Sequence, residues 1–570
     1  MRKQLTDLRR KMAERGIDAY IVPTTDFHGS EYVNDHFKCR EYISGFTGSA
    51  GTLVVTAEDA GLWTDGRYFL QAAQELSGSG IHLMKMNQAA TPTIPEYLRE
   101  NIPSDGTVGF DGRIVGWSMG CELERDHSVI CDLDLAGEIW ADRPKLAGSA
   151  IYALPMEVTG ESAKSKLERI RRAMAEKHAD FHLITSLEEI AWLYNLRGND
   201  VKYTPVFYAF ALITMEEDRL YVLDRSFEER STLPYLQVFD DLRTLGPGRI
   251  LLNKDVTSYS LVNAISPQTE IISGTDPAEI MKATKNPVEI SCTRRAHIKD
   301  GIAMVKFLYW IKTNVGKQKI TEISASDRLE AFRRQQPGCF DLSFDTISGY
   351  MDNGAIVHYA PSPETDRELK PEGFLLVDSG GQYKDGTTDI TRTIVLGPLT
   401  GQMKEDYTTI LKSNLTLSMA KFAKGTTGTQ LDETARRPVR DRGLDFDHGT
   451  GHGVGHILSV HEGPNNISPR NGSWPITPGM ITTDEPGMYK EGEYGIRLEN
   501  ELLCVEDAGG SLKFEPITMC PFDREAIIPQ MLTEEERSYL NGYHRKVYDS
   551  LSQGLEQDLK DWLKEQTAPI

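Results

Sequence analysis

The chain has 570 residues, several times the usual length of one domain, so we expect about two to four domains. A hydrophobic fraction of 39% and an aromatic fraction of 8% are typical of a globular protein and argue against extended disorder. The net charge of −21 argues against nucleic acid or an anionic membrane as a partner.

The seven cysteines are scattered, odd in number and without CxxC spacing, which predicts neither a disulfide framework nor a zinc ribbon. The N-terminal segment is charged and amphipathic and lacks the apolar core of a signal peptide. No uninterrupted apolar run reaches the roughly 18 residues of a membrane helix. We therefore expect a cytoplasmic protein with no membrane partner.

The N-terminal half predicts two similar α/β domains in tandem. Leu5, Leu8 and Met12 form an apolar helical stripe that Gly16 would end, and a strand follows. The same helix pattern recurs at 171–176 before a second strand, and such repetition indicates duplicated domains. Later strands are predicted at 51–55 and 61–67, before a helix at 68–75, and their counterparts at 206–215 and 219–224.

Proline and glycine mark the ends of these domains. Pro144, Gly148 and Pro155 interrupt the first pattern, and Pro277 and Pro287 flank the second change of texture. The predicted domains are 1–154, 155–284 and 285–570.

The third region predicts helices at 288–313 and 321–335 and ends in a charged helix at 533–566. We interpret that last helix as a packing or dimerisation appendage. Between them, residues 374–395 predict a hairpin of two strands that carries Asp378 on one arm and Asp389 on the other. A carboxylate that ends an apolar strand needs a cation or hydrogen bonds to compensate its burial. For either aspartate alone, the alternative is a residue that caps a turn.

Three further motifs supply possible metal ligands. Glycines separate the histidines of 447–456, so the backbone can approach a ligand closely, although such a loop can also be an inert surface segment. Glu485 lies at a turn before Pro486, and Glu499 lies in a predicted alternating strand. Together these motifs offer one imidazole and four carboxylates, a set suited to two divalent ions such as Mn²⁺ or Co²⁺. The set is Asp378, Asp389, His452, Glu485 and Glu499.

The order of these motifs, ending in TGHGVG, DEPG and GIRLEN, resembles that of the pita-bread metallopeptidases. The segments FTGSAGTLVV, LWTDGRYFLQA, NGAIVHYAP and VHEGP resemble the long, three-domain, cytosolic type of X-prolyl aminopeptidase. The resemblance covers essentially the whole chain. It implies a multidomain fold of α/β and α+β type, with two creatinase-like N-terminal domains followed by a pita-bread catalytic domain.

The resemblance also implies roles for the ligands. Asp378 would bind one ion, His452 and Glu485 the other, and Asp389 and Glu499 both. A hydroxide held between the two ions would be the nucleophile, and Glu485 would also carry a proton to the leaving nitrogen.

Outside the ligand set, the resemblance assigns the binding of substrate and of the tetrahedral intermediate to three histidines, His358, His448 and His461. It implies that Arg497 orients the neighbouring bridging carboxylate and that Arg67 contacts the substrate. His456 departs from some members of the family, and we interpret it as an incidental residue behind the site.

The implied activity is release of the N-terminal residue from peptides with proline in the second position, by a homodimer with two divalent ions per subunit. Mn²⁺ is expected, although the same ligands accommodate Co²⁺ or Zn²⁺. Two alternatives stay open: a prolidase that cleaves only X-Pro dipeptides, and a non-catalytic pita-bread module that binds peptides.

Overall fold

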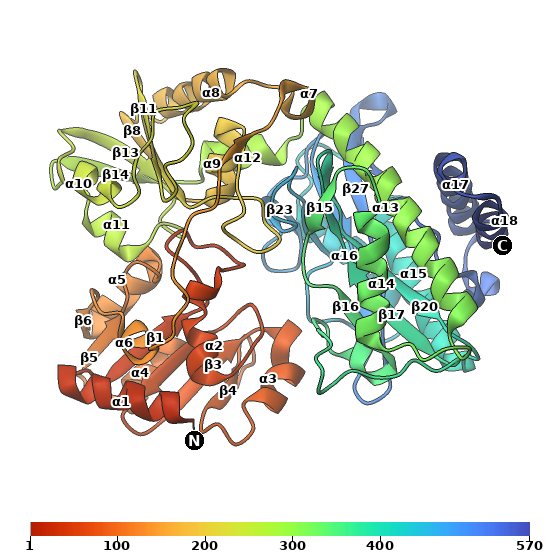
Figure 1. The fold of residues 1–570 in the computed structure, drawn as a ribbon, viewed down its shortest axis with the longest axis horizontal. Coiled ribbons are helices and arrows are strands. Elements are labelled where there is room, and N and C mark those ends of the chain that lie inside the picture. The colour runs from red at the N-terminus through yellow and green to blue at the C-terminus, as the bar shows by residue number, and fades with distance from the viewer. Residues whose placement is uncertain (1) are drawn as a thin grey trace. The chain divides into compact units, whose positions relative to one another are not determined.

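The computed structural model describes residues 2–570, which fold into two compact units (Figure 1). The first unit contains the chain up to Pro155 together with Glu161–Glu279, and the second contains Met156–Gly160 and Ile280–Ile570. Among the helices of residues 2–570, none is both long enough and apolar enough to cross a membrane.

The first unit holds two six-stranded sheets with equivalent strand orders, β4-β3-β2-β1-β5-β6 and β12-β11-β10-β8-β13-β14. This equivalence confirms the predicted duplication. The strands of the first sheet are β1 (Ala19–Pro23), β2 (Thr52–Thr56), β3 (Ala60–Thr64), β4 (His82–Lys85), β5 (Thr107–Phe110) and β6 (Ser128–Ile130). Those of the second are β8 (Phe181–Ile184), β10 (Ala209–Thr214), β11 (Asp218–Val222), β12 (Leu233–Pro234), β13 (Gly248–Leu252) and β14 (Thr269–Ser273).

Each sheet is preceded by an amphipathic helix, α1 (Lys3–Arg15) in the first copy and α8 (Ala163–Glu176) in the second. Helix α1 buries its predicted apolar stripe and ends at Gly16, whose φ of 66° is left-handed. The strand predicted at 61–67 is shorter than expected. It ends at Thr64 because the Asp65 side chain accepts the Arg67 N–H and starts a short 3₁₀ helix, η2 (Gly66–Tyr68).

In the second unit, the two predicted helices are α13 (Pro287–Asn314) and α14 (Glu322–Arg334). The predicted hairpin is confirmed: β17 (Phe374–Ser379) pairs antiparallel with β20 (Ile390–Val395), and β16 (Ile347–Tyr350) flanks β17. The segment between β17 and β20 is more than a turn. It contributes two short strands to a separate sheet, which consists of β15 (Cys339–Leu342), β18 (Gly381–Tyr383) and β19 (Gly386–Thr387).

The segments that carry the other predicted ligands, His452, Glu485 and Glu499, belong to a six-stranded sheet of order β21-β28-β27-β24-β22-β23 and to a two-stranded ribbon, β25-β26, or lie next to their strands. These strands are β21 (Lys421–Phe422), β22 (Gly451–Gly453), β23 (Glu462–Ile467), β24 (Ile481–Asp484), β25 (Gly487–Lys490), β26 (Tyr494–Arg497), β27 (Asn500–Glu506) and β28 (Leu512–Pro516). The continuous strand predicted around Glu499 is interrupted there, because the chain leaves the β25-β26 ribbon and enters the larger sheet.

The C-terminal helix predicted at 533–566 is divided into α17 (Glu534–Leu551) and α18 (Gln557–Gln566), with a 3₁₀ turn that ends at Gly554 between them. Both helices, dark blue in Figure 1, pack against α13, and α17 also packs against α15 (Gly401–Ser418). Leu540, Val547 and Leu563 are fully buried in the core of the second unit. The segment therefore packs on the second unit, which is one of the two roles interpreted from the sequence; dimerisation is the other.

We expect Gly495→Ala to destabilise the second unit. A Cβ at Gly495 would lie 1.7 Å from the carbonyl oxygen of Gly354, so a backbone segment would have to move. Overpacking of this kind costs about 1–3 kcal/mol or more in the free energy of unfolding, which urea denaturation measures. The matched control is Gly542→Ala in α17, where no atom lies within 4 Å of the added Cβ. The control should gain about 0.5–1 kcal/mol, and equal effects would contradict the prediction.

Candidate metal centre

The two aspartates of the hairpin lie close together because of the strand register. Asp378 is in β17 and pairs with Thr391 of β20, so Asp389 lies just outside the paired region on the neighbouring strand. Both side chains are buried, since Asp378 is 7% and Asp389 4% exposed. The hairpin thus places two carboxylates inside the second unit.

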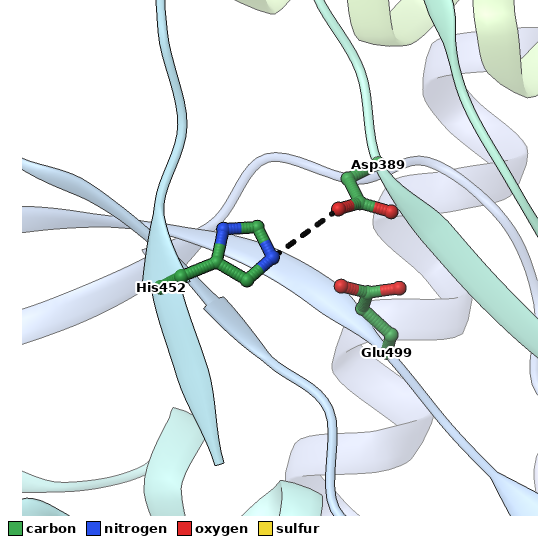
Figure 2. A group of neighbouring side chains, drawn as sticks. All are labelled: Asp389, His452 and Glu499. Atoms are coloured by element: carbon green, nitrogen blue, oxygen red, sulfur yellow. Dashed lines mark ion pairs between the residues drawn. The ribbon is translucent and has the colours of Figure 1, made fainter. Parts of the chain in front are cut away.

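His452 faces these carboxylates from β22. Its Nδ1 lies 2.8 Å from the carbonyl oxygen of Gly453, so Nδ1 carries the proton and donates it, and Nε2 presents a lone pair. That Nε2 lies 3.4 Å from Oδ2 of Asp389 and 3.5 Å from Oε1 of Glu485. Figure 2 shows the imidazole directed at Asp389, with Glu499 beside them. A lone pair that faces two carboxylates is the arrangement of ligands around a cation.

The two glutamates are fixed by their backbone. Glu485 follows β24, and its N–H donates to the carbonyl oxygen of Thr450 at 2.8 Å. Glu499 lies between β26 and β27, where its N–H donates to the carbonyl oxygen of Thr391 at 3.1 Å. The hydroxyl of Thr391 also donates to Oε2 of Glu499 at 2.8 Å. The interruption of the predicted strand at Glu499 therefore directs its carboxylate at the hairpin.

The carboxylates of this centre are not fully compensated by positive charge. Burial, followed by the charges of Asp378 and Glu501, raises the pKa of Asp389 well above its ordinary value. Burial, followed by the charges of Asp389 and Asp378, also raises the pKa of Glu499 well above its ordinary value. Burial raises the pKa of Glu485 to about 7. Buried carboxylates that repel one another in this way are stabilised by bound cations.

Two buried carboxylate oxygens of the centre lack a hydrogen-bond donor in the described chain, as is expected of atoms that bind a cation. Within residues 2–570, Oδ1 of Asp378 and Oε1 of Glu499 are buried and have no hydrogen-bond donor. Asp389, His452 and Glu499 each offer an atom in a group whose atoms all lie within 4.8 Å of one another. Carboxylate oxygens with one imidazole are suitable ligands for divalent transition metals. The residues present therefore fit the metal centre that the sequence predicts.

Arg497 contacts a different carboxylate from the one expected. Its Nη2 and Nε donate to Oδ2 of Asp378 at 2.7 and 3.2 Å, whereas the bridging carboxylate predicted for it, Glu499, is held by Thr391. The guanidinium is also 2.8 Å from the hydroxyl of Tyr489, and that hydroxyl is 2.8 Å from Nε2 of His448. A chain of hydrogen bonds thus connects His448 to Asp378, one of the predicted ligands.

The other predicted site residues are placed as follows. The ring of His461 packs edge-on against that of His452, with centroids 4.3 Å apart. His358 is half-buried in the segment after the 3₁₀ helix η3 (Met351–Ala355). Arg67 belongs to the first unit, where it pairs with Asp65 at 2.8 Å. His456 is buried, and its ring nitrogens lie 3.2 Å from the hydroxyl of Thr293 and 3.1 Å from the carbonyl oxygen of Val158.

Sequence reasoning missed Tyr489 and Thr391. Tyr489 lies in β25, four residues after Glu485, and a tyrosine in a short ribbon carries no signal of its own. Thr391 is the second residue after Asp389, and the alternation of the β20 segment predicts only that it shares a face with Asp389. Tyr489 contacts His448, and Thr391 contacts Glu499, both far away in the chain, so only the assembled fold identifies these contacts.

Comparison with known proteins identifies each part of the chain. Residues 291–506 match metallopeptidase family M24, and 510–570 match the C-terminal region of that family. Residues 4–141 and 142–289 each match a creatinase/prolidase N-terminal domain. The repeated match agrees with the two equivalent sheets of the first unit.

Similar proteins span the full chain. Aminopeptidase P1 of Arabidopsis thaliana is 36% identical and covers 100% of this chain and 99% of its own length. Xaa-Pro aminopeptidase 1 of Dictyostelium discoideum is 37% identical, with coverage of 100% and 96%. The X-prolyl aminopeptidase of Caenorhabditis elegans, described as a cytosolic enzyme with a di-nuclear active site, has 33% identity, a TM-score of 0.95 and coverage of 100% and 99%. The chain therefore belongs to the M24 metallopeptidases, as an aminopeptidase P relative with two creatinase-type N-terminal domains.

Proposed function

We propose that this chain is a metal-dependent aminopeptidase that releases the first residue of peptides with proline in the second position. The observation that carries the proposal is the lone pair of His452 directed at Asp389 and Glu485, beside buried carboxylate oxygens without donors. Full-length similarity to proteins named Xaa-Pro aminopeptidase supports this choice of substrate.

Two divalent ions supply Lewis acidity, which polarises a peptide carbonyl and lowers the pKa of water. The chain's own residues do the rest. Glu485 is half-buried at the end of β24, where it can take a proton from the nucleophile and pass it to the leaving proline nitrogen. Nδ1 of His448 donates to the carbonyl oxygen of Gly449, and Tyr489 holds its Nε2, so this ring is fixed for substrate contact. The proposed ligands are Asp378, Asp389, His452, Glu485 and Glu499.

An X-Pro peptide bond requires a dedicated site. It is a tertiary amide without an N–H, so it cannot complete the strand-like hydrogen bonding by which many peptidases hold their substrates. Its cis and trans isomers differ in shape, and a rigid site accepts one of them. We propose His358, His448, His461 and Arg67 as the residues that contact the peptide, as the family resemblance implies.

Two alternatives remain to be tested against this function. A prolidase would accept X-Pro dipeptides only, and a non-catalytic module would bind peptides without cleaving them. The grouping of Asp389, His452 and Glu499, with Asp378 and Glu485 also present in the chain, disfavours the second alternative.

Metal removal is expected to abolish the activity, and Mn²⁺ to restore it. Chelator-stripped protein is given Mn²⁺ and then three peptides: an Xaa-Pro-Pro tripeptide, an Xaa-Pro dipeptide and an Xaa-Ala-Ala tripeptide. We expect release of the first residue from the proline tripeptide only. Cleavage of the dipeptide alone would indicate a prolidase. Bound metal with no cleavage of any peptide would favour the binding module.

The finer features of the enzyme are also proposals. We propose Mn²⁺ as the metal, a homodimer formed through the catalytic domain, a cytoplasmic location, and domains at 1–154, 155–284 and 285–570. The C. elegans relative is described as cytosolic, which supports the location. Sedimentation of the purified protein at low concentration tests the dimer, and monomer alone would contradict it.

A further inference from the structure

Asp389 is held differently from the other acidic ligands. Asp378 accepts hydrogen bonds from Arg497, and Glu499 accepts one from Thr391. Within residues 2–570, no hydrogen bond is found to the carboxylate of Asp389, which faces Nε2 of His452 at 3.4 Å. Its direction therefore depends on how firmly the backbone of Asp389 is fixed.

That backbone is tied to a second buried acid. The N–H of Asp389 donates to Oε1 of Glu501 at 2.7 Å. Immediately before it, the N–H of Thr388 donates to the carbonyl oxygen of Gly381 at 3.0 Å, and the carbonyl of Thr388 accepts the hydroxyl of Ser343 at 2.8 Å. A hydrogen bond from an amide to a carboxylate is stronger than one to a neutral acceptor. Glu501 therefore provides the strongest restraint on this peptide unit.

Glu501 is itself fixed by a helix. Its side chain is 0% exposed, and Nε2 of His297, whose side chain is 2% exposed, lies 3.1 Å from its Oε2. The N–H of Glu501 donates to the hydroxyl of Thr518 at 2.8 Å. A fully buried carboxylate needs such a partner, because its charge has lost its hydration. Oε2 thus faces the His297 ring as its ion-pair partner, without the geometry of a hydrogen bond, and Oε1 accepts the Asp389 N–H.

Helix α13 carries His297 and packs directly on the strand that leads to Asp389. A Cβ at Gly386 of β19 would lie 3.1 Å from Cα of Thr293, so the helix and the strand are in close contact. Thr293 is one helical turn before His297, which places both on the same face of α13. The helix therefore fixes His297 relative to the backbone that it restrains.

We propose that His297 and Glu501 form a positioning pair that sets the backbone of Asp389 and so directs its two carboxylate oxygens at the metal centre. This inference rests on the proposed metal centre. Neither residue touches the substrate in this scheme, and both act through Asp389.

The test compares two substitutions of Glu501 in the full-length protein. Glu501→Gln keeps an oxygen that accepts the Asp389 N–H, whereas Glu501→Leu has similar size and leaves that N–H without its acceptor. Competition with a fluorescent chelator measures Mn²⁺ affinity, and the visible spectrum of Co²⁺-loaded protein reports ligand geometry. We expect Leu to weaken metal binding by about 10–100-fold and to alter the spectrum, and Gln to stay within about threefold of wild type.

A second pair of variants tests the helix end. His297→Gln keeps a polar group that can donate to Glu501, whereas His297→Leu leaves Oε2 without a polar partner on the helix. We expect His297→Leu to lower the affinity for Mn²⁺ and the kcat at saturating Mn²⁺ while KM is unchanged. His297→Gln should keep both quantities near the wild-type values. Thermal unfolding in chelator checks that each variant folds. If Glu501→Leu does not fold, the comparison of His297→Gln with His297→Leu tests the proposal in its place.

Three outcomes are distinguishable. Wild-type affinity and spectrum in all four variants would overturn the positioning pair. Equal losses for Glu501→Gln and Glu501→Leu would also overturn it, because the charge and not the hydrogen bond would then matter. If the wild-type protein itself binds no metal in the competition assay, the proposed centre fails, whatever the variants show.

Discussion

Asp389→Asn is expected to reduce hydrolysis of an Xaa-Pro-Pro tripeptide by roughly 10³-fold. The substitution keeps the size of the side chain and removes the charge that faces His452 at 3.4 Å. Loss of metal-supported charge stabilisation in the transition state is worth several kcal/mol, and about 4 kcal/mol corresponds to this factor. The initial rate in saturating Mn²⁺ measures it. Asp327→Asn, at an exposed position of α14, is the control and should keep the wild-type rate.

The same variant should be more stable than wild type when no metal is present. Burial and neighbouring charges raise the pKa of Asp389, so at neutral pH its ionised form costs folding free energy that asparagine does not. With Mn²⁺ at about 100 times its Kd, the wild type should gain about 2.7 kcal/mol and the variant almost nothing. Urea unfolding in chelator and in Mn²⁺ measures both. A variant less stable than wild type in chelator would contradict the repulsion inferred for this centre.

Of the substitutions for which we predict a change in stability, Glu462→Gln is expected to lower the free energy of unfolding most. Glu462 begins β23, and its side chain is 1% exposed between the ammonium groups of Lys282 and Lys285, with Lys282 Nζ at 2.7 Å. The two lysine side chains are 3% and 1% exposed. Removing the only negative charge of this trio would leave two buried cations beside each other. Breaking a buried ion pair costs about 3–5 kcal/mol, which urea denaturation measures.

Glu515→Gln is the matched control, because Glu515 also pairs with two cations, Arg294 at 2.6 Å and Lys546 at 3.2 Å, but at the surface. Its loss should be about 0–1 kcal/mol. Burial alone would raise the pKa of Glu462, but the charges of Lys282 and Lys285 hold it below its ordinary 4.5. The difference from wild type should therefore persist above that pH and shrink as the pH falls through the lowered pKa. Equal losses for the two variants would refute the role of burial.

The parts of the fold that follow from local pattern were predictable. The α1 stripe, the α13 span and the β17–β20 hairpin are each specified by residues close together in the chain, and so is the pair Asp378 and Asp389. The repeated helix and strand also predicted two equivalent sheets. Asp389, His452 and Glu499, which the fold brings together, could be named as candidate ligands from the sequence because each lies in a motif whose glycine, proline or apolar neighbours mark it.

The connections between those motifs were not predictable. Arg497 binds Asp378 instead of the adjacent Glu499, because the chain turns from one sheet into another between Arg497 and Glu499. His297 and Glu501 meet only after α13 packs on the β19 strand. Such pairings depend on packing across the whole unit, whereas periodicity reports one element at a time.

The five residues Met156–Gly160 belong to the second unit, although the chain on both sides of them belongs to the first. Two of their carbonyl groups have partners in the second unit: that of Thr159 accepts from Nδ2 of Asn286, the N-cap of α13, at 2.8 Å, and that of Val158 lies 3.1 Å from Nε2 of His456, which follows β22. During synthesis on the ribosome, this segment emerges long before the helix that it binds. A separately expressed fragment that begins at residue 285 would lack it, so we expect such a fragment to need the missing segment, added in trans as a peptide, to reach full solubility.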